Sequence, residues 1–147
     1  MMEARITVSG NVGAPVEHVR AQQPGSASRS VFRLACTPRF QRQGSWIDDQ
    51  TIWLRVTCWR GLAENVAESI NKGDPVTVVG KLRNNVWDDD DGHHQRLELD
   101  ADTVGPDLTR GVSVFRRTSR SDDDQADREE PGAGPSGDAA EAELAGV

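Results

Sequence analysis

Tryptophan and basic residues alternate along two segments of the chain. The residues at this spacing are Trp53, Arg55 and Trp59 in residues 51–59, and Lys81, Arg83 and Trp87 in residues 75–87. In a strand, alternate residues share one face. Indole faces stack on nucleobases, each base contributing about 1–3 kcal/mol, and cations neutralise phosphates without reading sequence. The pattern therefore predicts a surface for single-stranded nucleic acid, with DNA and RNA both open because a stacking surface accepts either.

Two alternatives stay open for these tryptophans. They could pack against a second sheet or a partner subunit, because exposed apolar patches are rarely left uncovered. Trp46 lies in a segment predicted to be a loop, where it could either pack within the loop or contact a base.

Hydrophobic alternation predicts the elements that position these residues. Strands are expected at residues 5–12, 30–39, 51–59, 75–87 and 95–102, and the inward positions include Val86 and Leu97. Apolar residues every four positions predict a helix at 62–71, ended by Lys72 and Gly73. Residues 40–50 are expected to be a polar loop, 88–92 a hairpin tip, and 111–115 a last short strand. Five strands with a helix between the third and fourth indicate an all-β OB-fold, a Greek-key barrel.

The cysteines and histidines do not indicate catalysis or metal binding. Cys36 and Cys58 fall on inward positions without a companion base, so neither is expected to be a nucleophile. His93 and His94 lie at the expected hairpin tip, and no further His or Cys has ligand spacing with them. We therefore predict no enzyme activity, no metal site and no cofactor.

Charge divides the chain of 147 residues into two parts. Residues 1–117 hold 15 basic and 15 acidic residues, whereas residues 118–147 hold two basic and nine acidic residues, the source of the net charge of −7. Residues 118–147 contain almost no large apolar side chain, so we predict a disordered acidic tail after a folded domain at 1–117. No apolar run reaches the roughly 20 residues of a membrane helix, and no signal peptide is visible, so a cytoplasmic protein is expected.

The central run TIWLRVTCWRGLAENVAESINKGDPVTVVGKLRNNVWDDDDG resembles the core of bacterial single-stranded DNA-binding proteins. ITVSGNVGAPVE and VFRLACTPRF resemble the first two strands of that family, and the resemblance extends over about residues 4–116. It implies an OB-fold homotetramer that binds single-stranded DNA in replication, recombination and repair, close to the nucleoid. VGPDLTRGVSVFR resembles an extra strand that joins subunits in actinobacterial members.

The resemblance also assigns candidate site residues. Trp53 and Trp87 match stacking tryptophans of the family, Trp59 stands where a stacking Phe is usual, and Phe40 lies near the remaining stacking position. Arg55, Lys72 and Arg83 match basic positions along the DNA path. Composition and alternation add further candidate phosphate contacts, namely Arg39, Arg42 and Lys81.

The chain departs from the family pattern in two places. Asn84, Asn85 and Val86 stand where basic residues are common, and four aspartates follow Trp87, so we expect weaker binding and a salt slope lower by about 0.7 × 2. The chain ends in EAELAGV rather than in an acidic run with Pro-Phe, so an auxiliary paralog with poor recruitment of partner enzymes is expected. The balanced charge of residues 1–117 supports an alternative, an OB-fold interaction protein with weak or no DNA binding.

Overall fold

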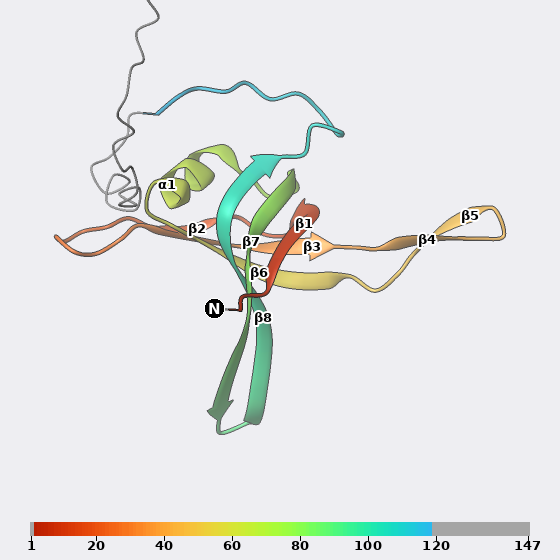
Figure 1. The fold of residues 1–147 in the computed structure, drawn as a ribbon, viewed down its shortest axis with the longest axis horizontal. Helices are drawn as coiled ribbons and strands as arrows, with labels where there is room; N and C mark the ends of the chain where they lie inside the picture. Colours follow the sequence, from red (N-terminus) through yellow and green to blue (C-terminus); the bar gives the residue numbers. More distant parts are fainter. Residues whose placement is uncertain (1, 119–147) are drawn as a thin grey trace, which may run out of the picture.

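Figure 1 shows the chain as a computed structural model, which describes residues 2–118. Their alternating pattern forms strands joined by turns and by a longer loop at residues 20–28, with one helix before β7. The elements are β1 (Arg5–Val12), β2 (Glu17–Val19), β3 (Arg29–Cys36), β4 (Arg39–Arg42), β5 (Ser45–Asp48), β6 (Ile52–Trp59), α1 (Arg60–Ser69), β7 (Pro75–Asp89) and β8 (Gly92–Pro106). The predicted tail falls almost entirely in residues 119–147, which lie outside the described residues.

Five strands close into a barrel. The sheet order is β1–β7–β8–β6–β3, and a further pairing of β1 with β3 completes the ring, while β2 adds to β3. The β6–β8 pairing is parallel, and the other pairings in the ring are antiparallel. The ring and the helix between β6 and β7 confirm the predicted OB-fold.

The barrel interior is filled by the inward positions of its strands. Phe32, Leu34, Val56, Val78 and Leu99 are at most 2% exposed. Burying side chains of this size stabilises the fold by roughly 1.5–3 kcal/mol each. Because alternate residues point inward, this core leaves the opposite positions of the same strands on the outside of the barrel.

The helix α1 packs its apolar stripe against this core. Ala63 and Val66 are buried within the helix, and Ile70 is buried directly after it. The four-residue spacing predicted this stripe correctly, but α1 begins two residues earlier than expected and ends at Ser69. The helix directly follows β6, with Trp59 as its N-cap residue, so that no loop separates the two.

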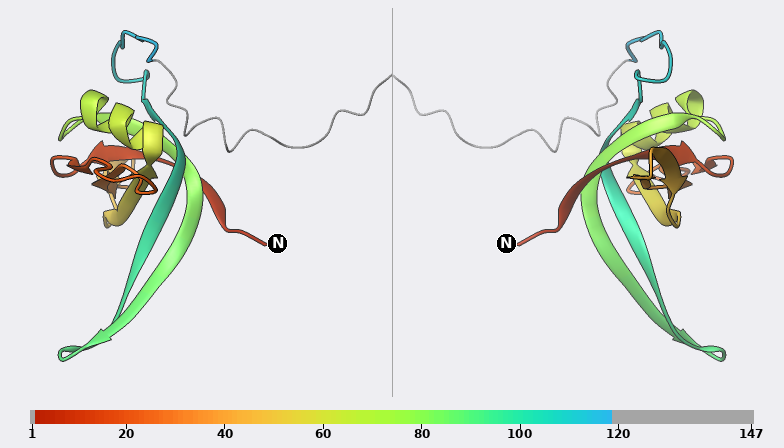
Figure 2. Two further views of the ribbon diagram at one scale, coloured as in Figure 1. Left: turned by 90° about the vertical axis from the view of Figure 1, so that its left-hand side faces the viewer. Right: turned by 90° about the vertical axis from the view of Figure 1, so that its right-hand side faces the viewer.

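Two hairpin arms extend from the barrel, as Figures 1 and 2 show for β7–β8 and Figure 1 shows for β4–β5. Val86 and Leu97, predicted to face inward, are 47% and 45% exposed because they lie in the β7–β8 arm. Alternation identifies which residues share a face but cannot show that this face has left the core. The turn of the arm is shorter than predicted, because Asp89 already pairs with Gly92.

The expected loop at 40–50 is wrong, because residues 39–48 form the β4–β5 hairpin. The turn residues Gln43 and Gly44 both have positive φ, 50° and 80°, as a tight two-residue hairpin turn requires. The flanking strands are only four residues each, too short for a clear alternating signal.

The β7–β8 pairing is irregular at Gly80, within the barrel. The β7–β8 register shifts between Val79 and Gly80, and a Cβ at Gly80 would lie 2.1 Å from the backbone oxygen of Asp100. Glycine therefore allows the two strands to approach closely at this irregularity.

The short strand expected at 111–115 is not formed in the structure of residues 2–118. Val112, Val114 and Phe115 are 100%, 95% and 85% exposed. A strand requires a partner for its backbone groups, and this segment pairs with none of the strands described here. The same residues include no helix long and apolar enough to cross a bilayer.

Candidate nucleic-acid interface

Strand register assembles the predicted residues on the outer face, by which we mean the outward side of β3, β6, β8 and β7. Arg33 pairs with Arg55, and Arg29 pairs with Trp59. Across the parallel junction Arg55 pairs with Glu98, which in turn pairs with Arg83. One continuous outward surface therefore extends from β3 to β7.

The four candidate stacking residues occupy the barrel and both arms. Trp53 and Trp59 lie near the two ends of β6 and are 48% and 47% exposed. Trp87 lies on the β7–β8 arm and is 38% exposed, whereas Phe40 lies on β4 and is 45% exposed. Each aromatic side chain presents surface to solvent, as stacking requires. Trp46, the ambiguous tryptophan, lies on β5 opposite Gln41 and is 64% exposed.

Each of the three sheet tryptophans has a guanidinium group over its ring. Arg33 lies 4.5 Å from the ring centroid of Trp53, Arg96 lies 5.1 Å from Trp87, and Arg29 lies 6.0 Å from Trp59. Trp87 also stacks with His94 at 5.3 Å and an interplanar angle of 17°. Such cation–π contacts contribute about 0.5–1 kcal/mol at exposed sites and hold the rings in defined orientations.

Three of the predicted phosphate contacts already bind carboxylates. Arg39 pairs with Asp48 at 2.7 Å, Lys81 with Glu3 at 3.0 Å, and Arg83 with Asp100 at 2.7 Å. A phosphate would have to compete with these carboxylates, which reduces the gain from each contact.

The other three predicted phosphate contacts are Arg55, Arg42 and Lys72. None of them forms an ion pair among residues 2–118, and they lie in different parts of the fold. Arg55 stands in the middle of the outer face. Arg42 is at the end of β4, next to the hairpin turn. Lys72 lies outside the sheet, in the turn before β7, where the neighbouring Gly73 N–H donates to the Val12 carbonyl at 2.7 Å. The structure therefore places Arg55 beside the tryptophans and Lys72 away from them.

Glu98 balances the positive charge at the centre of the face. Burial of its carboxyl group opposes ionisation. Hydrogen bonds from Arg96 and Asn85, with the nearby charges of Arg96 and Arg55, outweigh burial and lower the pKa of Glu98. Arg96 binds Glu98 Oε1 through Nε at 3.1 Å and through Nη2 at 2.8 Å. Because Glu98 stays ionised, the centre of the face is less positive than its arginines alone would make it.

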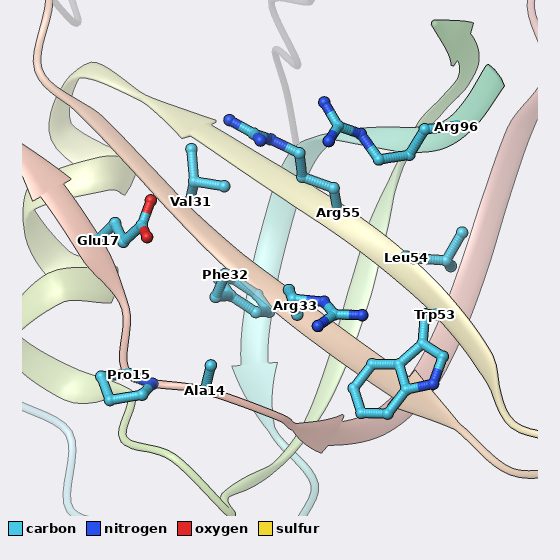
Figure 3. A pocket seen from close by; sticks show the side chains of 10 residues that line it. All are labelled: Ala14, Pro15, Glu17, Val31, Phe32, Arg33, Trp53, Leu54, Arg55 and Arg96. Atoms are coloured by element: carbon cyan, nitrogen blue, oxygen red, sulfur yellow. The ribbon is translucent and has the colours of Figure 1, made fainter. Parts of the chain in front are cut away.

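A pocket of about 340 Å³ opens on the outer face beside Trp53. Figure 3 shows Arg33 reaching across Trp53 at one end, and Arg55 and Arg96 at another, with Glu17 on the remaining side. Val31 and Phe32 of β3 form part of its wall. The volume lies within the range of roughly 300–1,000 Å³ typical of small-ligand pockets.

The two cysteines are buried or partly buried, and the two histidines of the β7–β8 arm contact aspartates. Burial raises the pKa of the Cys58 thiol to about 12 and also raises that of Cys36. His93 contacts Asp88 at 2.6 Å, and His94 contacts Asp89 at 2.8 Å. In the described part of the chain, no three His, Cys, Asp or Glu side chains are grouped as a metal site needs.

Residues 3–107 match the model of the single-strand binding protein family. The chain belongs to this family. It is 40% identical over 121 residues to the single-stranded DNA-binding protein of Corynebacterium glutamicum, a match that covers 80% of this chain but 53% of that protein. It is 39% identical over 140 residues to the corresponding protein of Paenarthrobacter nicotinovorans, covering 93% of this chain and 80% of that protein.

A solved structure shows the same fold. The small single-stranded DNA-binding protein from Streptomyces coelicolor superposes with a TM-score of 0.69 at 32% sequence identity, covering 76% of this chain and 100% of that chain. The resemblance seen in the residues is therefore confirmed, including its actinobacterial character.

Sequence reasoning missed the arginines that stack on the tryptophans. Arg29, Arg33 and Arg96 were not predicted as site residues, although each lies on an outward position. Alternation places Arg33 on the outer side of its strand, but only the strand register shows which tryptophan it meets. The available signal was that each strand next to a strand with tryptophans carries an outward arginine.

Proposed function

We propose that this protein binds single-stranded DNA by stacking bases on Phe40, Trp53, Trp59 and Trp87 and by neutralising phosphates with nearby basic side chains. The observation that carries the proposal is the continuous outer face, where exposed tryptophans alternate with guanidinium groups. Membership of the single-strand binding family supports it. Stacking accepts every base, so binding is expected to be independent of sequence.

The basic residues are expected to contribute unequally. Arg55 forms no ion pair among residues 2–118 although it lies opposite Glu98, whereas Arg39, Lys81 and Arg83 must first release Asp48, Glu3 and Asp100. Arg42 lies at the end of β4, and Lys72 lies outside the sheet. Binding is therefore expected to depend strongly on stacking and less strongly on salt, as the Asn84–Asn85 sequence already indicated.

The proposal extends to assembly and role. The chain forms a homotetramer with a folded domain at 1–117, and the exposed apolar side chains of Val112, Val114 and Phe115 supply surface for contacts between subunits. It acts by equilibrium binding without catalysis, has an auxiliary role in replication, recombination and repair, and resides with the DNA in the bacterial cytoplasm. Light scattering coupled to size exclusion tests the tetramer directly.

A titration against labelled oligonucleotides tests the binding. The full chain is expected to bind oligo(dT) and to bind a duplex of equal length much more weakly, because paired bases cannot stack on the tryptophans. Equal affinity for both polymers would contradict the stacking mechanism. Competition with oligo(U) measures whether RNA is accepted as well.

A further inference from the structure

The pocket beside Trp53 combines the two kinds of group that one nucleotide needs. Arg55 and Arg96 lie on one side, because Arg55 is the register partner of Glu98 and Arg96 Nη2 binds Glu98 Oε1 at 2.8 Å. Arg33 and Trp53 form a stacked pair at the other end, with 4.5 Å between the guanidinium carbon and the ring centroid. Figure 3 shows Arg55 and Arg96 near each other and Arg33 extending toward the ring of Trp53.

The arginines retain donors for a further ligand. A guanidinium group has five N–H donors, and Arg96 uses its Nε and one Nη2 donor on Glu98. Arg55 forms no hydrogen bond or ion pair with another side chain of residues 2–118. Glu98 thus fixes the orientation of Arg96 while leaving its outer donors available. Two guanidinium groups with free donors at one opening form a site for a phosphate.

The Arg33–Trp53 pair provides a surface for the base. Gly13 supports the edge of the Trp53 ring, since a Cβ there would lie 2.6 Å from Trp53 Cζ3. Arg33 covers the indole, so a base entering from the pocket meets the guanidinium plane first. Bases stack on arginine planes as well as on aromatic rings.

We propose that this pocket anchors a single nucleotide of the bound strand, with its phosphate between Arg55 and Arg96 and its base on the Arg33–Trp53 stack. The inference rests on the proposed function and adds the place where the strand is held. It assigns binding roles to Arg33 and Arg96, and it places the phosphate contact of this pocket on β6 and β8, where Arg96 is held by Glu98.

Glu17 adds a second negative charge beside the site, after that of Glu98. Among the ten described residues that line the pocket, it is the one that carries a carboxylate, and it forms no ion pair or hydrogen bond through its side chain there. Its charge repels a phosphate. Glu17→Gln should therefore tighten binding by about threefold, whereas removal of an arginine charge should weaken it.

Salt-dependent titration of the full chain with oligo(dT) tests the shared phosphate. Arg55→Gln and Arg96→Gln are each expected to weaken binding about tenfold, the effect of losing a charge-assisted hydrogen bond. The double variant should lower the log–log salt slope by about 0.7, the value for one phosphate, rather than by about 1.4. Arg116→Gln, which removes an equal charge at an exposed pair with Glu68, is the control and should leave affinity and slope unchanged.

A conservative variant tests the base stack separately. Arg33→Lys keeps the charge but removes the planar surface, so affinity should fall severalfold while the salt slope stays unchanged. Affinity equal to that of the unaltered protein would show that no base stacks on Arg33.

The outcomes separate the inference from the function on which it rests. One case is that the unaltered protein binds oligo(dT) while the salt slope of the Arg55/Arg96 double variant is either unchanged or lower by about 1.4. Either slope would contradict a phosphate shared by the two arginines and would leave the proposed DNA binding intact. If the unaltered protein fails to bind at low salt, the proposed function itself is wrong. Thermal unfolding checks that each variant is folded. If an arginine variant is unfolded, Glu17→Gln, which removes no contact, replaces it as the test. Unchanged or weaker oligo(dT) binding by Glu17→Gln would then overturn the phosphate site.

Discussion

At the level of single side chains, the position of Trp53 depends on Gly13. A Cβ at this position would lie 2.6 Å from Trp53 Cζ3, closer than real Cβ contacts. Gly13→Ala should displace the indole and remove part of the roughly 1–3 kcal/mol that one stacked base contributes. The measurement is oligo(dT) affinity, with Gly105→Ala as the matched control because a Cβ there meets no atom within 4 Å. Equal affinity of the two variants would show that Trp53 does not depend on Gly13.

The two cysteines should differ in reactivity because Cys58 is more deeply buried than Cys36. The Cys58 side chain is inaccessible and its pKa is about 12, so its thiol stays protonated at neutral pH and well above it. Only the thiolate is nucleophilic. A maleimide or disulfide reagent at pH 8 should modify Cys36 in the native protein and Cys58 only after unfolding, and raising the pH to 9 should accelerate Cys36 alone. Mass spectrometry of the labelled peptides measures this, and prompt native labelling of Cys58 would refute it.

At the level of strands and helix, one buried hydroxyl joins β3 to α1. Ser30 is fully buried, donates to the Ala63 carbonyl at 2.6 Å and meets His18 Nδ1 at 2.8 Å. Ser30→Ala would leave these groups without their partner, which should cost about 1–3 kcal/mol of unfolding free energy. Chemical denaturation measures the loss. Ser45→Ala, on the exposed β5, should change stability by under about 0.5 kcal/mol, and a similar effect of both changes would exclude this role for Ser30.

The acidic turn of the β7–β8 arm should oppose DNA binding. Asp90 and Asp91 form its two turn residues, close to Trp87 along the arm. Asp90→Asn should tighten oligo(dT) binding about twofold at low salt, and the gain should vanish at high salt because exposed charges are screened. Glu68→Gln makes the same charge change on α1, away from the outer face, and should leave affinity unchanged. Equal effects of the two changes would show that Asp90 acts only through the net charge of the protein and not through its position near Trp87.

The sequence predicted these elements unevenly, for physical reasons. Long alternating runs such as residues 51–59 predicted β6 and its two faces, and the four-residue spacing of Leu62, Val66 and Ile70 predicted α1. Alternation did not show that β7 and β8 extend past the barrel, which exposes Val86. The β4–β5 hairpin was missed because its strands are too short for a period and its turn depends on positive φ at Gln43, which leaves no composition signal.

The same limit applies to the site. Residue types and parity predicted the tryptophans and Arg55 as outward groups, and the structure places them so. Parity could not show that Lys81 and Arg83 are held by Glu3 and Asp100. The acids come from other strands, and only register brings them together. Charges that look equivalent in the sequence therefore differ in their freedom to meet a phosphate.

For the whole chain, the balance of charge sets the expected salt dependence. Residues 1–117 carry no net charge, and several basic groups of the outer face are paired with carboxylates. If about three phosphates are neutralised per protomer, the log–log slope should be about −2. Substitution of Trp53 by Leu should weaken binding at every salt concentration while leaving this slope unchanged, since an indole carries no charge. A slope altered as much as the affinity would contradict this separation of stacking from phosphate contacts.

Intrinsic tryptophan fluorescence of the full chain, titrated with oligo(dT) at several salt concentrations, tests base stacking on the outer face most directly. We predict strong quenching that saturates, because Trp53, Trp59 and Trp87 are all partly exposed where bases would stack. We also predict that the midpoint moves to higher DNA concentration as salt rises. Absence of quenching at low salt would contradict the stacking mechanism and would indicate that these tryptophans are covered by other protein surface.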